Sequence, residues 1–183
     1  MPKQLLPYRG TTLLAHCLEQ AVQSEIKNIL LVLGAYADDI NKVIEHRKNL
    51  SVLINSGWKE GMASSIRLGL SNLLEKDTPP ETVLFMTCDQ PFVTSAHLNH
   101  LYDAHINSGV QVVASRYGNS AGIPALFSKE IFAELLCLEG DAGAKKIIQK
   151  EPSRVSYVDC ESGEIDIDTP PDWEIFIKGA NAN

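Results

Sequence analysis

Short apolar runs alternate with amphipathic segments along most of this chain. The runs with the length and composition of buried strands cover 28–34, 51–55, 83–86 and 110–115. The segments between them, such as 62–74, carry apolar residues at helical spacing. Strands that alternate with helices predict an α/β fold with three layers, in which helices cover both faces of a mostly parallel sheet.

Length and charge narrow the classes of partner. A chain of 183 residues favours one domain over 1–183, and its net charge of -7 argues against nucleic acid or an anionic membrane as partner. No apolar run approaches the ~20 residues of a membrane span. The 4 cysteines lie far apart, as is typical of reduced thiols in a cytoplasmic protein. We therefore expect a small-molecule partner, and an anionic one would need local cations or a metal.

One acidic residue stands at a strand end. The run at 83–86 continues into the sequence TCDQP, which places Asp89 where open α/β sheets bind their ligands, with Pro91 stiffening the turn. A carboxylate there is a natural ligand for a hard cation that accompanies phosphates. Asp is also common as a turn residue after strands, so both interpretations stay open for Asp89.

Polar residues also begin two predicted helices. Gly61 precedes a helix whose first turn contains Ser64 and Ser65, where free backbone N–H groups favour an anion or a polar ligand edge. The alternative is that these serines only cap the helix. Asp141 either caps a later helix or contacts a substrate. The segment 122–127 predicts a short or edge strand, because Pro124 cannot donate to a ladder.

The sequence EIDID near the end of the chain alternates acids with isoleucine. In an extended strand Asp166 and Asp168 would point to one face, where two carboxylates repel unless a cation or water screens them. One interpretation pairs one of these acids with Asp89 around a divalent metal. The other is a solvated acidic strand end.

Six segments together resemble a known family. In chain order they are PKQLLPYRGTTLL, WKEGMASSIRLGL, CDQPFV, GIPALF, GDAGAKK and DIDTPPDW. At this spacing they are similar to the MobA-like nucleotidyltransferases, closest to the molybdenum cofactor cytidylyltransferases. The resemblance implies a Rossmann-like sheet of the nucleotide-diphospho-sugar transferase type. It also implies Mg²⁺-dependent transfer of CMP or GMP, from CTP or GTP, to a molybdopterin-type phosphate with release of pyrophosphate.

The resemblance also assigns residue roles. Asp89 and Lys3 match catalytic positions, and Lys3 is in addition a cation for the phosphates. Asp89, Asp168 and the neighbouring Asp166 match the metal-binding acids. The nucleotide side corresponds to Gly61, Ser64 and Ser65. The acceptor side corresponds to Gly122, Pro124, Asp141 and Gly143. Cys88 stands where the family usually has glycine, which adds bulk beside the metal position.

The chain departs from the family at its start. The family opens with a central strand and a Gly-rich LAAGxSxRMG loop, whereas here Met1 stands directly before Pro2-Lys3. Loss of that strand would leave two interior edges, between the strands at 28–34 and 83–88, and each unpaired buried polar group costs about 1–3 kcal/mol. We expect a shortened form of a longer protein. The sheet would then close up, or a neighbouring chain would donate a strand and form a homodimer.

The absent loop also predicts a poor catalyst. Triphosphate affinity should rise when the missing segment is restored. Two other functions stay open: a non-catalytic protein that binds a cofactor or nucleotide, and a sugar-phosphate nucleotidyltransferase. Titration with CTP, GTP and Mg²⁺ separates these alternatives.

Overall fold

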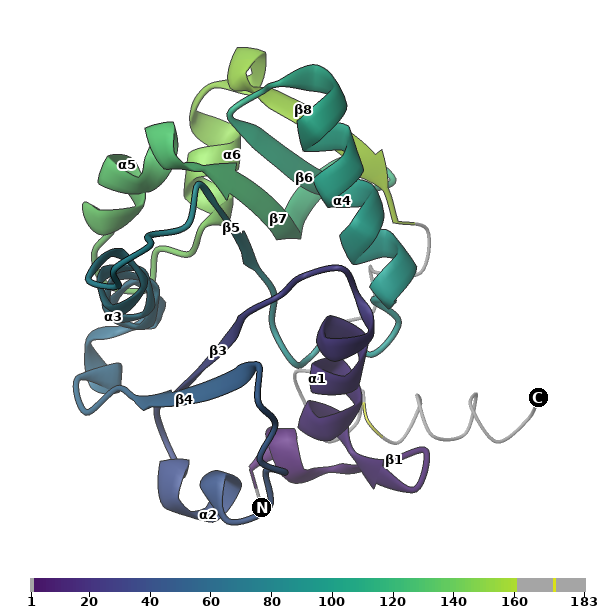
Figure 1. Cartoon of the computed structure of the whole chain (residues 1–183), viewed down its shortest axis with the longest axis vertical. Coiled ribbons are helices and arrows are strands. Elements are labelled where there is room, and N and C mark those ends of the chain that lie inside the picture. The colour runs from purple at the N-terminus through teal and green to yellow at the C-terminus, as the bar shows by residue number, and fades with distance from the viewer. Residues whose placement is uncertain (1, 161–172, 174–183) are drawn as a thin grey trace.

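The computed structural model of the chain describes residues 2–160 and Trp173 (Figure 1). Asp166 and Asp168 lie outside these described residues. The helices are α1 (Leu13–Gln23), α2 (Ala37–Asn41), α3 (Met62–Leu74), α4 (Ser95–Ser108), α5 (Phe132–Leu136) and α6 (Lys145–Lys150). The strands are β1 (Pro7–Tyr8), β2 (Thr11–Thr12), β3 (Ile29–Leu33), β4 (Leu50–Ile54), β5 (Thr82–Phe85), β6 (Val112–Tyr117), β7 (Ser120–Ser128) and β8 (Val155–Asp159). Short 3₁₀ turns cover Lys3–Leu5, Trp58–Glu60, Lys129–Ile131 and Pro152–Arg154.

The strands confirm the expected Rossmann-like α/β class. β3 pairs with β4 in parallel, and a second sheet has the order β5-β7-β6-β8. β6 and β8 are parallel, whereas β7 runs antiparallel to both of its neighbours. β1 and β2 form a separate small hairpin. Strand direction is therefore more mixed than the alternating pattern predicts, because β6 and β7 are joined by a tight turn that needs no crossover helix.

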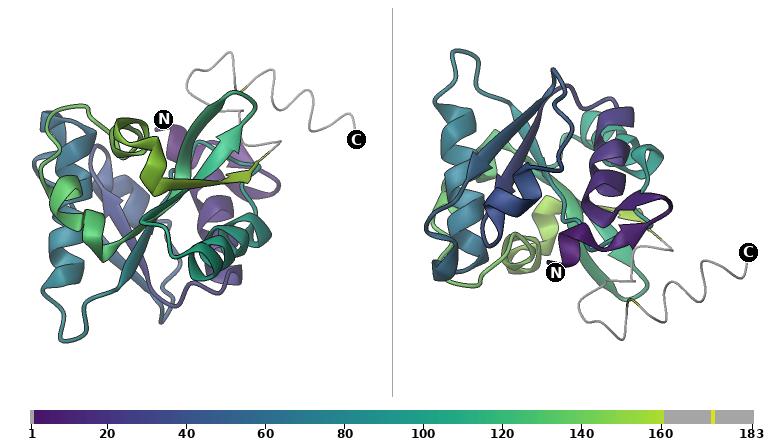
Figure 2. Two further views of the ribbon diagram at one scale, coloured as in Figure 1. Left: turned by 90° about the horizontal axis from the view of Figure 1, so that it is seen from above. Right: turned by 90° about the horizontal axis from the view of Figure 1, so that it is seen from below.

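Helices cover both faces of these strands. Figure 2 shows α1 and α4 on one side and α3 on the other. Alternate residues of β6 face opposite layers: Val112 and Ala114 pack with α3, α5 and α6, whereas Val113 packs with Leu101 of α4. The sequence expectation of a sheet covered on two faces is confirmed. In the part of the chain that the structure describes, no helix is long and apolar enough to cross a membrane.

The expectation that residues 122–127 form an edge strand is wrong. β7 lies between β5 and β6 in the interior of its sheet. Its register with β6 shifts so that Ala114 opposes Ala125 while Ser115 opposes Gly122, and its pairing with β5 ends where Phe85 opposes Ala125. Pro124 falls within this shift and past the end of β5, where neither neighbour needs an N–H donor.

Within the described residues, no backbone ladder joins the sheet of β3 and β4 to the sheet that contains β5. Among the described residues, the edges of β3 and β5 that face one another carry no strand pairing. Every residue of β5 is only half-buried. In β3 the residues before Leu33 are half-buried and Leu33 itself is buried. Ile29 shares a hydrophobic cluster with Leu84, and Leu33 shares another with Cys88, so β3 and β5 run in the same direction. Closure of the sheet by direct pairing is therefore a wrong expectation, and a strand from a neighbouring chain stays a prediction.

Threonine side chains cap the starts of α1 and α4. Thr12 Oγ1 accepts a hydrogen bond from the Ala15 N–H at 3.2 Å, and Thr94 Oγ1 accepts one from the His97 N–H at 3.2 Å. Gly109 ends α4 in the left-handed conformation. The spacing of Ile40, Val43 and Ile44 in the sequence favours a helix over 38–48. That prediction is wrong in length, because α2 ends at Asn41 and Val43 is 55% exposed.

Acid should weaken the ion pairs that Glu134 makes with Arg154 and Lys150. Arg154 and Lys150 both donate to the Glu134 carboxylate, at 2.7 Å and 2.8 Å, and they lower its pKa to about 2. The folded state therefore favours the ionised carboxylate, so its stabilisation is complete above the ordinary glutamate pKa and is lost as the pH falls toward 2. We expect Glu134→Gln to lower the free energy of unfolding by up to about 1 kcal/mol at pH 7.

Urea unfolding at pH 7 and pH 3 measures this difference, which should shrink at the lower pH. Glu45→Gln is the matched control, because the Glu45 side chain is 82% exposed beside Arg47. An equal loss for Glu134→Gln at both pH values would contradict the assignment.

Candidate functional site

Lys3 and Asp89 meet although 86 positions separate them in the sequence. Lys3 begins the first 3₁₀ turn, and Asp89 lies in the turn that follows β5. Lys3 Nζ donates to Asp89 Oδ2 at 2.9 Å, and the two side chains are 33% and 20% exposed. This partial exposure keeps both charges within reach of a ligand while limiting their contact with water. The structure therefore brings the predicted phosphate cation and the predicted metal ligand to one point.

Cysteine at position 88 is accommodated beneath this pair. The Cys88 side chain packs in an apolar cluster with Leu33 and Ala37, and its carbonyl accepts a hydrogen bond from Cys17 Sγ at 3.4 Å. Burial raises the pKa of Cys88 to about 11 and that of Cys17 to about 12. Both thiols are therefore protonated at neutral pH, so neither competes with Asp89 as an anionic metal ligand.

The predicted nucleotide and acceptor segments touch each other. The Ala63 N–H donates to the Gly140 carbonyl at 3.0 Å. Gly61 has φ +118°, and a Cβ there would overlap the Gly140 backbone and lie 2.6 Å from Asp141 Oδ1. A Cβ on Gly143 would lie 2.8 Å from Met62 Sδ. Glycine at 61 thus allows the start of α3 to pack against the Gly140 backbone, and glycine at 143 leaves room for the Met62 side chain.

Asn55 organises the start of α3, and sequence reasoning missed it. Its Nδ2 donates to Ser64 Oγ at 2.8 Å and to Ser65 Oγ at 2.9 Å. Its Oδ1 accepts a hydrogen bond from the Gly57 N–H at 2.9 Å, and Asn55 as a whole is only 4% exposed. Ser64 Oγ also donates to the Gly61 carbonyl at 2.8 Å. This is not a helix cap, because Gly61 occupies the N-cap position of α3 and no side chain accepts from the free N–H groups there. Only Ser65 of the two serines is left partly exposed.

The predicted acceptor strand is held by buried polar groups. Ser115 Oγ donates to the Pro124 carbonyl at 2.6 Å, and His97 Nε2 lies 2.7 Å from the same hydroxyl. Desolvation by burial lowers the pKa of His97. The neutral ring therefore donates from Nε2, because the hydroxyl hydrogen is already used. Gly122 and Pro124 are both buried, so only their backbone edges are available for recognition.

A second set of contacts joins this strand to the turn that contains Asp89. Tyr117 donates its hydroxyl to the Ile123 carbonyl, and Gln90 Nε2 donates to the Tyr117 oxygen at 3.3 Å. Gln90 directly follows Asp89 and is 5% exposed. The acceptor strand and the predicted metal ligand are thus held by one hydrogen-bonded chain. Sequence reasoning missed Gln90, because a polar residue in a turn gives no sign that it is buried.

The carboxylate of Asp89 has the chemistry of a hard-cation ligand. Magnesium and manganese take oxygen donors and are often held by one or two carboxylates together with substrate phosphates. Within residues 2–160 and 173, no three His, Cys, Asp or Glu side chains gather as a metal-binding group. Among these described residues Asp89 supplies one carboxylate, and further oxygen ligands would have to complete the coordination of a cation there. The predicted partners Asp166 and Asp168 lie outside the described residues.

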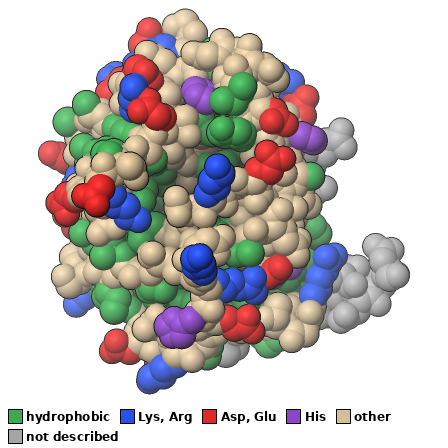
Figure 3. Space-filling model, viewed as in Figure 1, with side chains coloured by type: hydrophobic (Ala, Val, Ile, Leu, Met, Phe, Trp, Pro, Cys, Tyr) green, Lys and Arg blue, Asp and Glu red, His purple; other side chains and the backbone are tan. Residues whose placement is uncertain are grey.

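Charge on the molecular surface is compatible with an anionic ligand. Several basic side chains lie over the middle of the face shown in Figure 3, and most acidic side chains on that face lie nearer its rim. A net charge of -7 would otherwise repel a triphosphate. Local cations such as Lys3 offset that repulsion at short range.

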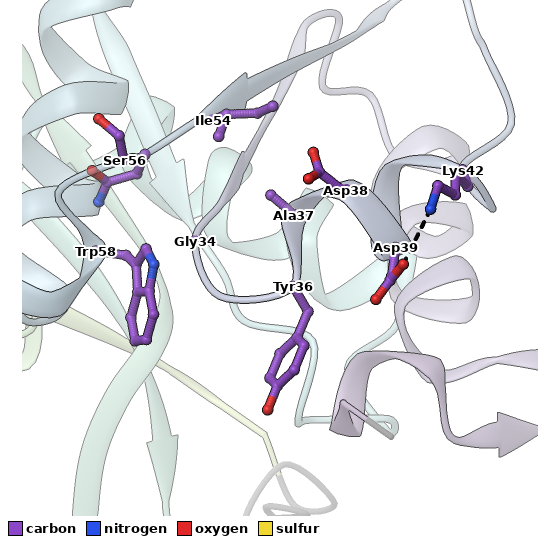
Figure 4. A pocket seen from close by; sticks show the side chains of 10 residues that line it. Gly34, Tyr36, Ala37, Asp38, Asp39, Lys42, Ile54, Ser56 and Trp58 are labelled. Atoms are coloured by element: carbon purple, nitrogen blue, oxygen red, sulfur yellow. Dashed lines mark hydrogen bonds and ion pairs between the residues drawn. The ribbon is translucent and has the colours of Figure 1, made fainter.

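A pocket of about 450 Å³ lies at the carboxyl ends of β3 and β4. It is lined by Gly34, Tyr36, Ala37, Asp38, Asp39, Lys42, Ile54, Asn55, Ser56 and Trp58 (Figure 4). Ala37 and Cys88 belong to one hydrophobic cluster, which places the pocket on the same side of the sheet as Asp89. Sequence reasoning missed Tyr36 and Trp58, because single aromatic residues in loops carry no periodic signal.

Loss of the Asn55 amide should destabilise the site. Asn55→Ala leaves the Gly57 N–H and both serine hydroxyls without their present partner, and we expect a loss of about 1–3 kcal/mol in the free energy of unfolding. Urea unfolding measures it. Asn99→Ala is the matched control, because Asn99 Oδ1 accepts one exposed bond from the Glu25 N–H at 2.8 Å. Equal losses for the two variants would show that the Asn55 bonds are not special.

Comparison with known proteins gives a family match. Residues 1–155 match the family described as the MobA-like NTP transferase domain. Nicotine blue oxidoreductase of Paenarthrobacter nicotinovorans is 29% identical over 179 residues, which cover 92% of this chain and 84% of that protein.

Solved structures share the fold. Rv0371c of Mycobacterium tuberculosis H37Rv superimposes with a TM-score of 0.79 at 30% identity, covering 97% of this chain and 90% of that one. Another structure of Rv0371c is a complex with manganese, at 29% identity. 4-Diphosphocytidyl-2C-methyl-D-erythritol synthase of Anaerococcus prevotii has a TM-score of 0.74 at 18% identity, covering 97% of this chain and 89% of that one, and shows the fold alone.

Proposed function

Because the chain belongs to the MobA-like NTP transferase family and is a nucleotidyltransferase, we propose that it transfers CMP or GMP from CTP or GTP to the phosphate of a molybdopterin-type acceptor. A phosphate oxygen of the acceptor forms a bond to the α-phosphorus, the bond from that phosphorus to the β-bridging oxygen breaks, and pyrophosphate leaves. Such transfers need mainly positioning and charge neutralisation. The observation that carries the proposal is the contact between Lys3 Nζ and Asp89 Oδ2 at 2.9 Å.

The roles proposed for this pair follow from its geometry. Asp89 would hold a divalent cation, Mg²⁺ or Mn²⁺, together with Asp168 and Asp166. The bound cation would neutralise charge that develops around the α-phosphate. Lys3 would contact the phosphates of the leaving pyrophosphate. Its ammonium lies beside the Asp89 carboxylate, which would keep Lys3 close to the phosphates of a nucleotide bound there. The manganese complex of Rv0371c supports a divalent cation in a related protein.

The backbone contact between Gly61 and Gly140 supports a reaction between two substrates bound side by side. The segment proposed for the nucleotide, Gly61 with Ser64 and Ser65, packs directly on the segment proposed for the acceptor, Asp141 with Gly143. Two substrates bound on these segments would approach each other without a conformational change of the backbone. Gly122 and Pro124 would complete the acceptor side, and the hydrogen-bonded chain through Gln90 and Tyr117 links them to Asp89.

The test measures nucleotide binding before turnover. Isothermal titration of the full chain with CTP and with GTP should show binding that needs Mg²⁺ or Mn²⁺ and that disappears with a chelator. Pyrophosphate release should then require a molybdopterin-type acceptor. No metal-dependent binding of either nucleotide would refute the proposal. Release with a sugar phosphate in place of molybdopterin would reassign the acceptor.

A second candidate arises from one relative. The protein named nicotine blue oxidoreductase is 29% identical over 92% of this chain, and its name states a redox activity. If the chain shares that activity, electron transfer should proceed without nucleotide cleavage. The pyrophosphate assay separates the two functions, because a redox reaction releases no pyrophosphate.

A further inference from the structure

We propose that Tyr36 and Trp58 form a binding site for a flat nitrogen-containing heterocycle in the pocket at the carboxyl ends of β3 and β4. The heterocycle is either the base of the nucleoside triphosphate or the pterin of the acceptor. Only this pair of candidates rests on the proposed function; the binding of a flat heterocycle does not. A pocket of about 450 Å³ has the size of small-ligand sites. Parallel strands such as β3 and β4 bind ligands beyond their carboxyl ends.

The two aromatic rings are presented to solvent rather than packed. Tyr36 is 64% exposed and Trp58 is 41% exposed. In Figure 4 they project in the same direction on either side of the turn at Gly34. Large aromatic side chains stabilise a fold mainly when they are buried. Exposed rings beside a pocket offer stacking faces to a planar ligand, and every nucleobase or pterin has such a face.

The backbone is shaped to hold the rings in place. Tyr36 has φ 60°, a left-handed conformation that a bulky residue adopts at an energetic cost. Gly34 lies against the base of the Trp58 side chain, since a Cβ at position 34 would be 2.7 Å from Trp58 Cβ. Lys59 Nζ lies 5.7 Å from the centre of the Trp58 ring. The turn after β3 and the turn after β4 are therefore fitted to each other, and each carries one ring.

The charged rim indicates the kind of group that enters. Asp38 and Asp39 line the pocket, and Lys42 Nζ is paired with Asp39 Oδ1 at 3.2 Å. Carboxylates accept hydrogen bonds from ring N–H and exocyclic amino groups but repel phosphate. The pocket therefore suits the neutral heterocyclic end of a substrate, with its phosphates directed toward Lys3.

Asn55 connects this pocket to the rest of the site. Its Oδ1 fixes the Gly57 N–H one residue before Trp58, while its Nδ2 binds Ser64 and Ser65 at the start of α3. A heterocycle on Trp58 would thus rest on a turn bonded to the proposed nucleotide segment. This places the aromatic pair as a determinant of which ring system the protein selects.

Titration with phosphate-free ligands tests the site apart from the metal and from catalysis. Cytidine, guanosine and neopterin are each titrated calorimetrically into the full chain and its variants. Trp58→Ala and Tyr36→Gly should each weaken the ligand that binds by about 5- to 100-fold. Trp58→Phe, which keeps a ring, should retain most of the affinity. Glycine adopts positive φ freely, so Tyr36→Gly removes the ring without straining the turn.

Tyr102→Ala is the matched control, because Tyr102 is 39% exposed on α4 outside the pocket. Dissociation constants for Trp58→Ala and Tyr36→Gly that equal the control's would overturn the proposal, as would no binding of any of the three ligands to the unaltered chain. Binding of a nucleoside assigns the pocket to the triphosphate, and binding of neopterin assigns it to the acceptor. Heterocycle binding that depends on the rings, without pyrophosphate release, would refute the proposed function and leave this inference standing.

Discussion

Asp89→Asn should lower the rate of nucleotidyl transfer by about 10³-fold without unfolding the protein. Asparagine has nearly the same size, but it carries no charge to hold the Lys3 ammonium, whose Nζ lies 2.9 Å from Asp89 Oδ2. It is also a poorer ligand for a hard divalent cation. Pyrophosphate release at saturating Mg²⁺ measures the rate, and thermal unfolding measured on the same samples reports the fold.

Asp159→Asn is the control for this substitution. Asp159 also pairs with a basic residue, since Arg116 Nε lies 2.5 Å from its Oδ1, but it lies on the exposed end of β8. Its rate should stay within about twofold of the unaltered chain. If Asp89→Asn keeps more than about a tenth of the activity, the proposed metal role of Asp89 is wrong.

Gly61→Ala should reduce the free energy of unfolding by about 2–5 kcal/mol and separate the two substrate segments. At φ +118° an alanine is strained, and its Cβ would overlap the Gly140 backbone, which cannot turn aside as a flexible side chain can. The hydrogen bond from the Ala63 N–H to the Gly140 carbonyl would lengthen or break. Urea unfolding measures the stability, and the Michaelis constant for the acceptor reports the separation.

Gly140→Ala tests the same contact from its other side. Gly140 also has positive φ, +60°, but a Cβ there meets nothing within 4 Å. We expect a loss of about 1–2 kcal/mol, from backbone strain alone. Equal losses for the two variants would mean that the close approach of Gly61 adds nothing.

Periodicity predicted the elements that lie in the core. The run that became β6 is apolar because side chains cover both of its faces. The runs that became β3 and β5 are half-buried, and β4 leaves Ile54 52% exposed, so their apolar pattern located each strand but overstated its burial. The interior place of β7 was not predictable from Pro124, because the register shift beside it depends on the partner strand. The end of α2 at Asn41 also escaped prediction, since nothing packs over Val43 to extend the apolar stripe.

The site was predicted to the extent that its motifs resemble a family. That resemblance predicted Lys3 and Asp89 as catalytic residues, and the structure places their side chains in contact. Asn55, Tyr36 and Trp58 were not predicted, because their importance lies in contacts between distant turns rather than in spacing along the chain. The paired role of Asp89 with Asp168 stays a prediction, as does a single domain over 1–183.

The unpaired edges between β3 and β5 have a mechanical consequence. The aromatic pocket lies at the ends of β3 and β4, whereas Asp89 follows β5, and within the described residues no strand ladder joins β3 to β5. Interdigitated side chains slide more readily than a hydrogen-bonded ladder shears. The distance between Trp58 and Asp89 can therefore vary more easily than it could within one continuous sheet. A substrate that contacts both residues would fix that distance.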